Sequence, residues 1–153
     1  MFVYLVRHGE AKTEEEDPER GLSAKGFREA TSTGAYVRDR GIKPCIIYHS
    51  GKKRAAQTAQ IISDILKMQK GMVETKSLAP MEDPRIWVQR LSGANEDVML
   101  VGHLPHLANL AGHLLGGGTK DDVADFKTGG IMCLKRLGDD HWVLDWSISP
   151  GFS

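Results

Sequence analysis

The first apolar run of the chain places the strongest constraint on its fold. Residues 2–6 form a hydrophobic run with no polar interruption, and the run stops on Arg7 and His8, which Gly9 follows at once. Such a run is typical of a strand buried on both faces, as in the middle of a parallel sheet covered by helices. Strands of these sheets present functional residues at their carboxyl ends. The sequence therefore favours an α/β domain with a ligand site where this strand ends.

The three residues at the end of the run are suited to binding an anion. Arg7 carries a planar fork of donors that matches a phosphate or a carboxylate. His8 carries an imidazole that can act as a base or a nucleophile, and Gly9 lets the backbone come close to a ligand. The alternative interpretation is that Arg7 and His8 are solvated residues at a strand end. We favour the functional interpretation, because such strand ends commonly line pockets.

The order of strand, polar residue and helix recurs twice along the chain. The β-branched run 45–48 predicts a second buried strand, which leads into a helix with Arg54 in its first turn. Free backbone N–H groups and the helix dipole favour an anion there, and the Arg54 guanidinium adds a two-pronged contact. The apolar run 98–101 predicts a third strand, which ends on His103 and precedes a helix whose first turn contains Pro105.

Residues at the carboxyl ends of these strands can meet, because the ends share one edge of a doubly wound sheet. We therefore predict one site formed by four side chains, Arg7, His8, Arg54 and His103. Two guanidinium groups and two imidazoles without metal-binding carboxylates suit a tetrahedral oxyanion, which points to phosphate. A metal site is disfavoured, because His103, His106 and His113 lack the i, i+4 spacing and the carboxylates of such sites. No metal and no cofactor is predicted.

The helices between and after these strands are expected to act as scaffold. Ser23 is predicted to cap a helix with one apolar face, made of Phe27, Ala30, Gly34 and Val37. A short helix is predicted with Ile86, Val88 and Leu91 on its apolar face. The helix after Pro105 is predicted to bury Leu107, Leu110, Ala111 and Leu114.

The C-terminal third of the chain is expected to change the direction of the sheet. Residues 116–118 predict a flexible break, and residues 119–125 a polar connection. The apolar runs 132–134 and 142–148 predict the last two strands, and the short turn between them suggests antiparallel pairing. With a weaker strand at 72–75, the prediction is a mostly parallel sheet with an antiparallel edge.

Length and composition exclude several classes of protein. A chain of 153 residues fits one domain, residues 1–153, whose hydrophobic core is large enough to be stable without disulfides or a structural metal. Twenty basic and twenty acidic residues give no net charge, so nothing in the balance points to nucleic acid or to an anionic membrane. No apolar stretch approaches the roughly 18 residues of a membrane span. The only two cysteines are not spaced as paired metal ligands, which suggests that both are buried thiols. We expect a soluble cytoplasmic protein.

Three motifs in this order resemble those of the histidine phosphatase superfamily. They are residues 5–11 with the Arg-His-Gly sequence, residues 54–59 and residues 101–103. Within the superfamily, the compact length and residues 20–26, 102–105 and 146–150 resemble the SixA-type phosphohistidine phosphatases. The similarity extends from residue 1 to about residue 150. It implies a phosphoglycerate mutase-like fold, a three-layer α/β/α sandwich around a mostly parallel sheet with an antiparallel edge.

The resemblance also implies a role for each predicted site residue. His8 would attack phosphorus in line and form a phosphohistidine on the enzyme, which water then hydrolyses. Arg7, Arg54 and His103 would bind the equatorial oxygens, with Gly9 in the substrate site, and no metal is required. The partner would be a protein that carries phosphohistidine. A nucleophile must be neutral, and the positive charges of the two arginines disfavour the imidazolium form of His8.

One position departs from the pattern of the superfamily's esterases. Many members place a glutamate two residues after the leucine that corresponds to Leu78, where it protonates the leaving alkoxide; this chain has Pro80. A general acid is worth about a hundredfold to ten-thousandfold in rate, so its loss would be severe for an alkyl phosphate. An imidazole leaving from phosphohistidine can already carry its proton. Three other carboxylates remain candidate proton donors, Asp17, Glu82 and Asp83, against the more ordinary interpretation that each is a solvated loop residue.

Two further functions stay open at this point. One is a broader phosphomonoesterase, including activity on phosphoserine or phosphothreonine. The other is a non-catalytic phosphate-binding adaptor that kept the fold, although a module freed from catalysis has no chemical need for His8.

Overall fold

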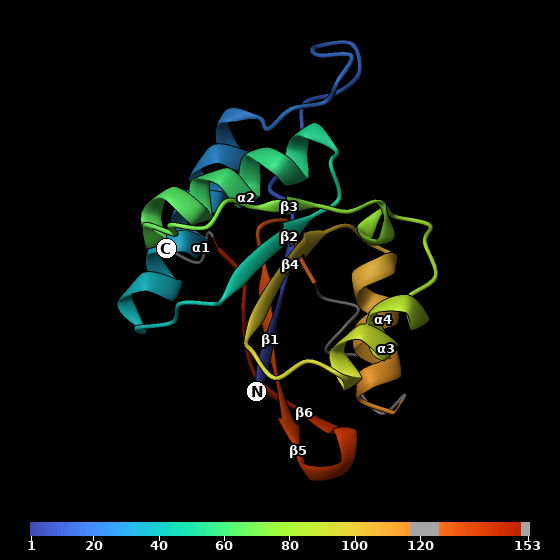
Figure 1. Ribbon diagram of the computed structural model, residues 1–153. Coiled ribbons are helices and arrows are strands. Elements are labelled where there is room, and N and C mark those ends of the chain that lie inside the picture. The colour runs from blue at the N-terminus through green and yellow to red at the C-terminus, as the bar shows by residue number, and fades with distance from the viewer. Residues whose placement is uncertain (117–125, 151–153) are drawn as a thin grey trace.

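A computed structural model describes residues 1–116 and 126–150. Its centre is a six-stranded sheet in the order β3-β2-β4-β1-β5-β6 (Figure 1). The strands are β1 Phe2–Arg7, β2 Ile46–His49, β3 Val73–Glu74, β4 Val98–Gly102, β5 Ile131–Leu137 and β6 His141–Ile148. β1 to β4 pair in parallel, whereas β5 pairs antiparallel with both β1 and β6. The predicted mixed sheet is therefore confirmed.

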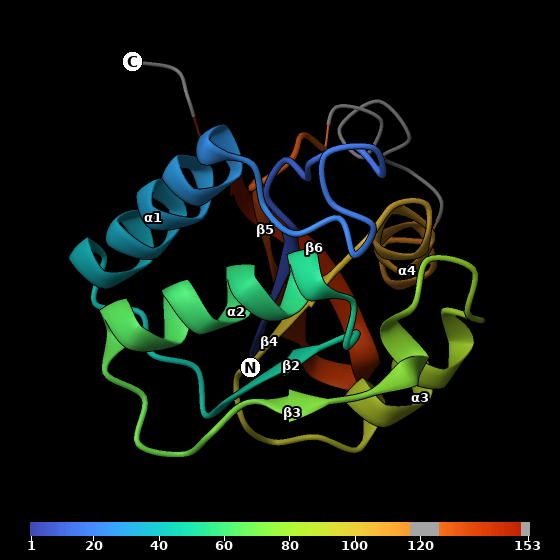
Figure 2. The ribbon, with the colours of Figure 1, turned by 90° about the horizontal axis from the view of Figure 1, so that it is seen from above.

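Two pairs of helices cover opposite faces of this sheet, so the fold has three layers (Figures 1 and 2). The helices are α1 Ala24–Asp39, α2 Lys53–Leu66, α3 Arg85–Ser92 and α4 His106–Leu114, with single 3-10 turns η1 Lys76–Leu78 and η2 Gly138–Asp140. α1 and α2 lie together on one face, and α3 and α4 on the other. The expected α/β/α sandwich is thus confirmed.

The alternation of side chains along β1 divides the core in two. Val3 and Leu5 pack in the cluster that contains the apolar residues of α3 and α4. Tyr4 and Val6 pack in the cluster that contains those of α1 and α2. All four side chains are at most 5% exposed, as expected for a central strand covered on both faces. β1 is therefore a rigid base for the polar residues that follow it.

Helix α1 begins as predicted but packs through a different face. The Ser23 side chain accepts a hydrogen bond from the Gly26 N–H, which confirms the cap. Phe27 was placed on the buried face and is 43% exposed, so this prediction was wrong. α1 instead approaches the site loop through Gly26, where a β-carbon would lie 2.1 Å from the Glu10 carbonyl oxygen. This close contact sets the rotation of the helix and turns Phe27 outward.

Helix α3 is also rotated relative to its predicted face. Ile86 is 42% exposed, whereas Trp87 is 2% exposed. The Trp87 ring packs edge-on against Tyr48 at 5.0 Å, and its indole N–H donates to the Ser77 Oγ at 3.0 Å. A tryptophan with a satisfied N–H gains more from burial than an isoleucine does, which explains the difference. The predicted core face of α4 is confirmed, since its four apolar residues are buried.

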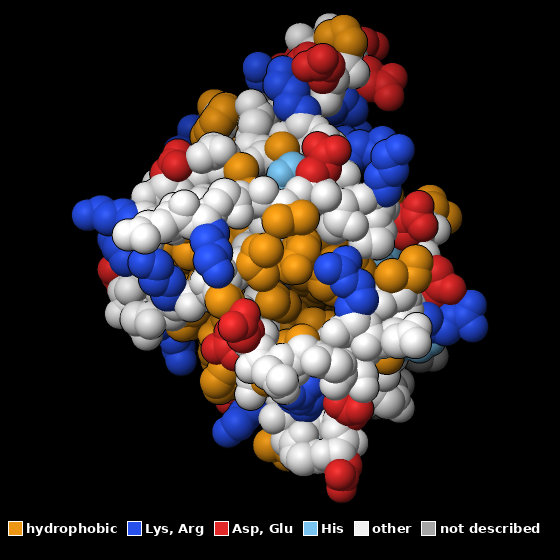
Figure 3. All heavy atoms as spheres, in the orientation of Figure 1, with side chains coloured by type: hydrophobic (Ala, Val, Ile, Leu, Met, Phe, Trp, Pro, Cys, Tyr) orange, Lys and Arg blue, Asp and Glu red, His pale blue; other side chains and the backbone are white. Residues whose placement is uncertain are grey.

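The two-residue strand β3 forms one edge of the sheet. Val73 in this strand is 38% exposed, and β2 extends past it at Ile46. Figure 3 shows hydrophobic side chains around a hollow in the middle of this face of the molecule. Cys133 of β5, the strand next to the opposite edge strand β6, is buried, whereas Cys45, just before β2, is partly exposed.

Part of the prediction for the C-terminal third concerns residues that the structure does not describe. Gly116 is described, whereas the rest of the predicted flexible break and the predicted polar connection at 119–125 fall outside the described residues. Within residues 1–116 and 126–150, no helix is both long and apolar enough to span a bilayer.

Candidate active site

The carboxyl ends of β1, β2 and β4 bring the predicted site residues to one edge of the sheet. Arg7 at the end of β1 is opposite Gly102 at the end of β4, and the His8 N–H donates to the Gly102 carbonyl at 3.0 Å. The His8 and His103 rings therefore lie with their centroids 5.0 Å apart. Arg54 in the first turn of α2 is near enough for its charge to act on both imidazoles. Residues from three separate segments thus share one site.

His8 is held in a single orientation and tautomer. Its side chain is 9% exposed, and Nδ1 lies 2.6 Å from the Gly9 carbonyl oxygen. A carbonyl only accepts, so Nδ1 must carry the proton and Nε2 keeps its lone pair. Burial lowers the pKa of His8 to about 4, and the charges of Arg54, Arg7 and Arg20 act in the same direction against the Gly9 hydrogen bond. His8 is therefore neutral at physiological pH, as a nucleophile must be.

His103 is the more deeply buried of the two histidines. It is 1% exposed, and its Nε2 lies 2.6 Å from the Ser50 Oγ. Burial lowers the pKa of His103 to about 3, with contributions from His8, Arg54 and Lys52. His103 is thus neutral and fixed by Ser50. Sequence reasoning missed Ser50, although its place just after β2 follows the same strand-end rule as His8.

Arg7 is anchored on the side of the site away from α2. Its Nη1 donates to the Phe126 carbonyl at 2.9 Å, while among the described residues its buried Nε has no partner. Burial lowers the pKa of Arg7, and the charge of Glu29 raises it. The 8% exposed Glu29 carboxylate accepts hydrogen bonds from the Glu10 N–H at 2.8 Å and the Thr128 hydroxyl at 3.0 Å. Glu29 therefore ties α1 to the loop after β1 and helps to keep Arg7 charged.

Gly9 has a packing role in addition to the predicted role in substrate binding. A β-carbon at this position would lie 2.6 Å from the Gly26 carbonyl oxygen, so α1 occupies the space. The Gly9 N–H donates to the Thr58 hydroxyl at 3.0 Å, and this hydroxyl donates to the Arg54 carbonyl at 2.8 Å. Gly9 thus links the loop after β1 to α2. Contact between Gly9 and the substrate stays a prediction.

Comparison with known proteins identifies the family. A model of the histidine phosphatase superfamily (branch 1) matches residues 3–79. The chain belongs to this superfamily.

Two curated relatives match part of this superfamily member. One is a 2,3-bisphosphoglycerate-dependent phosphoglycerate mutase of Chelativorans sp. (strain BNC1), 41% identical over 71 residues, which are 42% of this chain and 34% of the mutase. The other is phosphoglycerate mutase 1 of Saccharomyces cerevisiae, 39% identical over 64 residues, which are 39% of this chain and 26% of that protein. The match thus spans about a third or less of the curated relatives.

Two solved structures match the superfamily member over almost its whole length. The protein histidine phosphatase SixA complexed with tungstate is 23% identical with a TM-score of 0.87, covering 98% of this chain and 97% of its own. The putative phosphohistidine phosphatase SixA from Agrobacterium tumefaciens is 26% identical with a TM-score of 0.83, covering 97% of each chain. These structures show the same fold, including the part after residue 79.

The candidate proton donors of this superfamily member differ in their surroundings. The Asp83 carboxylate binds the Arg85 guanidinium through both oxygens, and these hydrogen bonds lower its pKa to about 2. Hydrogen bonds from backbone N–H groups and Lys53 lower the pKa of Asp17 to about 2. Both groups are ionised at neutral pH and have no proton to donate. Glu82 is exposed, and its charge acts on His106 in α4.

Among the described residues, no group of three or more His, Cys, Asp or Glu side chains is arranged to hold a metal ion. The groups that the structure brings together at this edge of the sheet are two imidazoles and the surrounding guanidinium groups, which together suit a phosphoryl group.

Proposed function

We propose that this protein is a metal-independent phosphatase that removes phosphate from a phosphohistidine protein. The observation that carries the proposal is the state of His8, a buried neutral imidazole whose Nδ1 is fixed by Gly9 and whose Nε2 lone pair is available. Its place beside Arg7, Arg54 and His103 suits nucleophilic attack on a phosphoryl group.

The proposed reaction has two steps on His8. Its Nε2 attacks phosphorus as the P–N bond of the substrate breaks, and the bonding electron pair returns to the leaving imidazole, which departs as a protonated ring. Water then attacks the phosphohistidine on His8 and releases inorganic phosphate. Arg7 and Arg54 bind the equatorial oxygens and stabilise the charge in both steps, while the neutral His103 donates a hydrogen bond to the phosphoryl group.

The surroundings of the leaving group favour a phosphoramidate over an ester. Position 80 is proline, and Asp17 and Asp83 are both held ionised, so neither can protonate an alkoxide. An alkyl phosphate would lack an acid worth about a hundredfold to ten-thousandfold. Phosphohistidine needs no such acid, because its leaving imidazole can carry its own proton.

The full-length structural similarity supports the same choice. The chain and the SixA of Agrobacterium tumefaciens cover 97% of each other, whereas the matched segment is 34% of the Chelativorans mutase. We further propose that residues 1–153 form one domain that acts in the cytoplasm on a phosphorylated protein, with no nucleic acid or membrane partner.

The direct test compares two substrates at equal concentration. Phosphate release is measured from a phosphotransfer protein phosphorylated on histidine and from phosphoserine, an alkyl phosphate. We expect the first to react at least a hundredfold faster in kcat/KM. His8→Ala should abolish both activities, and His113→Ala, a change at an exposed histidine of α4, is the matched control that should retain them. Turnover by His8→Ala at the rate of the unchanged protein would rule out the mechanism.

The ester alternative depends on Glu82, which has no pairing partner among the described residues that would keep it from reaching the site. If the protein hydrolyses esters well and Glu82→Gln removes that activity alone, the broader phosphomonoesterase is the correct function.

A further inference from the structure

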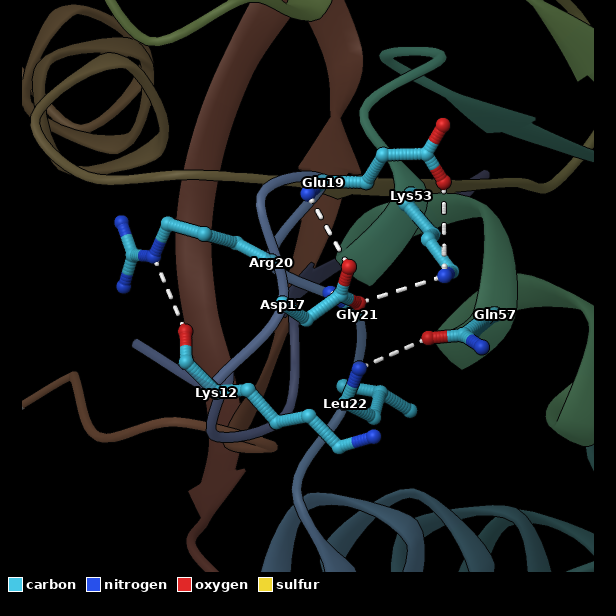
Figure 4. Close-up of polar contacts among 8 residues, drawn as sticks. All are labelled: Lys12, Asp17, Glu19, Arg20, Gly21, Leu22, Lys53 and Gln57. Carbon is cyan, nitrogen blue, oxygen red and sulfur yellow. Dashed lines mark hydrogen bonds and ion pairs between the residues drawn. The ribbon is translucent and has the colours of Figure 1, made fainter. Parts of the chain in front are cut away.

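The loop between β1 and α1 is fastened to the first turns of α2 by Asp17. The Asp17 carboxylate accepts hydrogen bonds from the Gly21 N–H at 2.9 Å and the Glu19 N–H at 3.1 Å (Figure 4). It also pairs with the Lys53 Nζ at 3.2 Å, and its side chain is only 17% exposed. Because Lys53 precedes Arg54, this pair places the loop beside the guanidinium of the site.

A second group of contacts fixes the end of the loop. The Leu22 N–H donates to the Gln57 Oε1 at 2.7 Å, and the Lys12 N–H donates to the Gly21 carbonyl at 2.8 Å. A β-carbon at Gly21 would lie 2.9 Å from the Lys53 Cε and 3.0 Å from the Gln57 Oε1. The loop therefore lies directly on α2, and a larger residue at position 21 would require the Lys53 and Gln57 side chains to shift.

Arg20 lies between these fastened points in an unusual conformation. Its φ of 50° is in the left-handed region, which non-glycine residues seldom adopt. Its Nε donates to the Lys12 carbonyl at 3.0 Å, and Figure 4 shows the guanidinium directed away from the Asp17–Lys53 pair. Within the described residues, no carboxylate pairs with it.

The charge of Arg20, which belongs to a loop that lies on the first turns of α2, acts on the site. It lowers the pKa values of both His8 and Arg54, so all three groups lie within electrostatic range of one another. Bringing a further cation toward buried arginines is unfavourable unless an anion lies between them. A strained backbone kept in such a place points to function.

We propose that Arg20 is a third arginine of the phosphoryl-binding site, and that Asp17 is the positioning residue that holds it there. Arg20 contacts the phosphoryl oxygens on the solvent side, where its two terminal nitrogens can donate together. Asp17 touches no substrate and acts through the fold of the loop. This inference rests on the proposed function, because it assumes that the site binds a phosphoryl group.

The test measures competitive inhibition by inorganic phosphate together with KM and kcat for the phosphohistidine protein. Arg20→Ala should weaken phosphate binding and raise KM by about tenfold to a hundredfold, the range for a charged hydrogen bond. Arg20→Lys should recover part of this loss. Asp17→Asn should raise KM several-fold at unchanged kcat. Glu19→Gln removes the other carboxylate on Lys53 and is the matched control, expected to match the unchanged protein.

The double variant Arg20→Ala with Asp17→Asn separates positioning from a merely structural effect. If Asp17 acts through Arg20, adding Asp17→Asn to Arg20→Ala causes no further loss. An equal loss in both backgrounds would overturn the role of Asp17, and phosphate inhibition within twofold of normal in Arg20→Ala would overturn that of Arg20. Failure of the proposed function looks different, because the unchanged protein itself would then release no phosphate from the phosphohistidine protein, whatever Arg20→Ala does to inhibition by inorganic phosphate.

Discussion

Single residues at the carboxyl edge of the sheet have properties that follow from burial. His8, His103 and Arg7 all lie in places where a charge is poorly solvated, and the two imidazoles respond by staying neutral while the arginine is supported by Glu29. The same burial that lowers the proton affinity of His8 leaves its Nε2 ready to form a bond. Nucleophilicity at this residue is therefore a consequence of how the chain folds around it.

The proton affinity of His8 can be measured directly. We expect its imidazole to titrate near pH 4 in an NMR titration, because burial and positive neighbours both disfavour the charged ring. Arg54→Ala should raise this pKa, since among the neighbouring charges that of Arg54 lowers the pKa of His8 the most. The same titration of His8→Ala identifies the His8 signal. Titration of His8 at its ordinary pKa of about 6.5 would contradict the description of the site.

The backbone of Arg20 provides a test of strain. Arg20→Gly and Arg20→Ala lose the same side chain, but only glycine adopts a φ of 50° without cost. We expect Arg20→Gly to be more stable than Arg20→Ala by about 1 kcal/mol in urea denaturation. Both variants should bind phosphate equally weakly. Equal stabilities would show that the position carries no strain.

At the scale of elements, the start of α1 connects this helix to the loop that follows His8. Ser23 caps the helix at Gly26, and its hydroxyl also lies 2.7 Å from the Glu10 carboxylate in the loop after His8. The Ser23 N–H donates to the Glu10 carbonyl at 2.9 Å. A change here therefore reaches the site through the backbone.

Removing the cap should lower stability and disturb the site together. Ser23→Ala is expected to cost about 1 kcal/mol of unfolding free energy, the usual value for a lost N-cap. Ser23→Asp would place a second carboxylate against Glu10, whereas Ser23→Thr keeps the hydroxyl and is the control that should restore stability. The measurement is chemical denaturation of each variant beside its kcat/KM. Full stability of Ser23→Ala would mean that the cap contributes nothing.

At the scale of the whole molecule, the sequence predicts the features that depend on long apolar runs. It does not predict the features that depend on how the helices pack. The buried strands and Arg7, His8 and His103 are predicted from apolar runs that stop on polar residues, and Arg54 is predicted from the first turn of the helix after such a run. The rotations of α1 and α3 could not be predicted, because they depend on the Gly26 contact and the Trp87 hydrogen bond. Glu29 was missed for the same reason, since a buried carboxylate in a helix has meaning only through partners distant in sequence.

Stability of the whole chain should fall in mild acid. His8 has a folded pKa of about 4 against 6.5 unfolded, so between these values the unfolded chain binds more protons. Its contribution is complete above pH 6.5 and is lost as pH falls toward 4, amounting to about 3 kcal/mol at about 1.4 per tenfold change in proton affinity. His103 acts in the same direction. Urea denaturation from pH 7 to pH 4 measures the loss, and a flat profile would contradict it.

The grouping of cations around His8 also has a thermodynamic consequence for any oxyanion in solution. Arg7, Arg54 and Arg20 repel one another only when the chain is folded, because unfolding carries them far apart. An oxyanion such as inorganic phosphate that binds among them would be bound by the native chain alone, and so would shift the folding equilibrium by mass action. The melting temperature should therefore rise with the logarithm of oxyanion concentration, and chloride at equal ionic strength should leave it unchanged. An oxyanion that fits the site would therefore stabilise the folded chain.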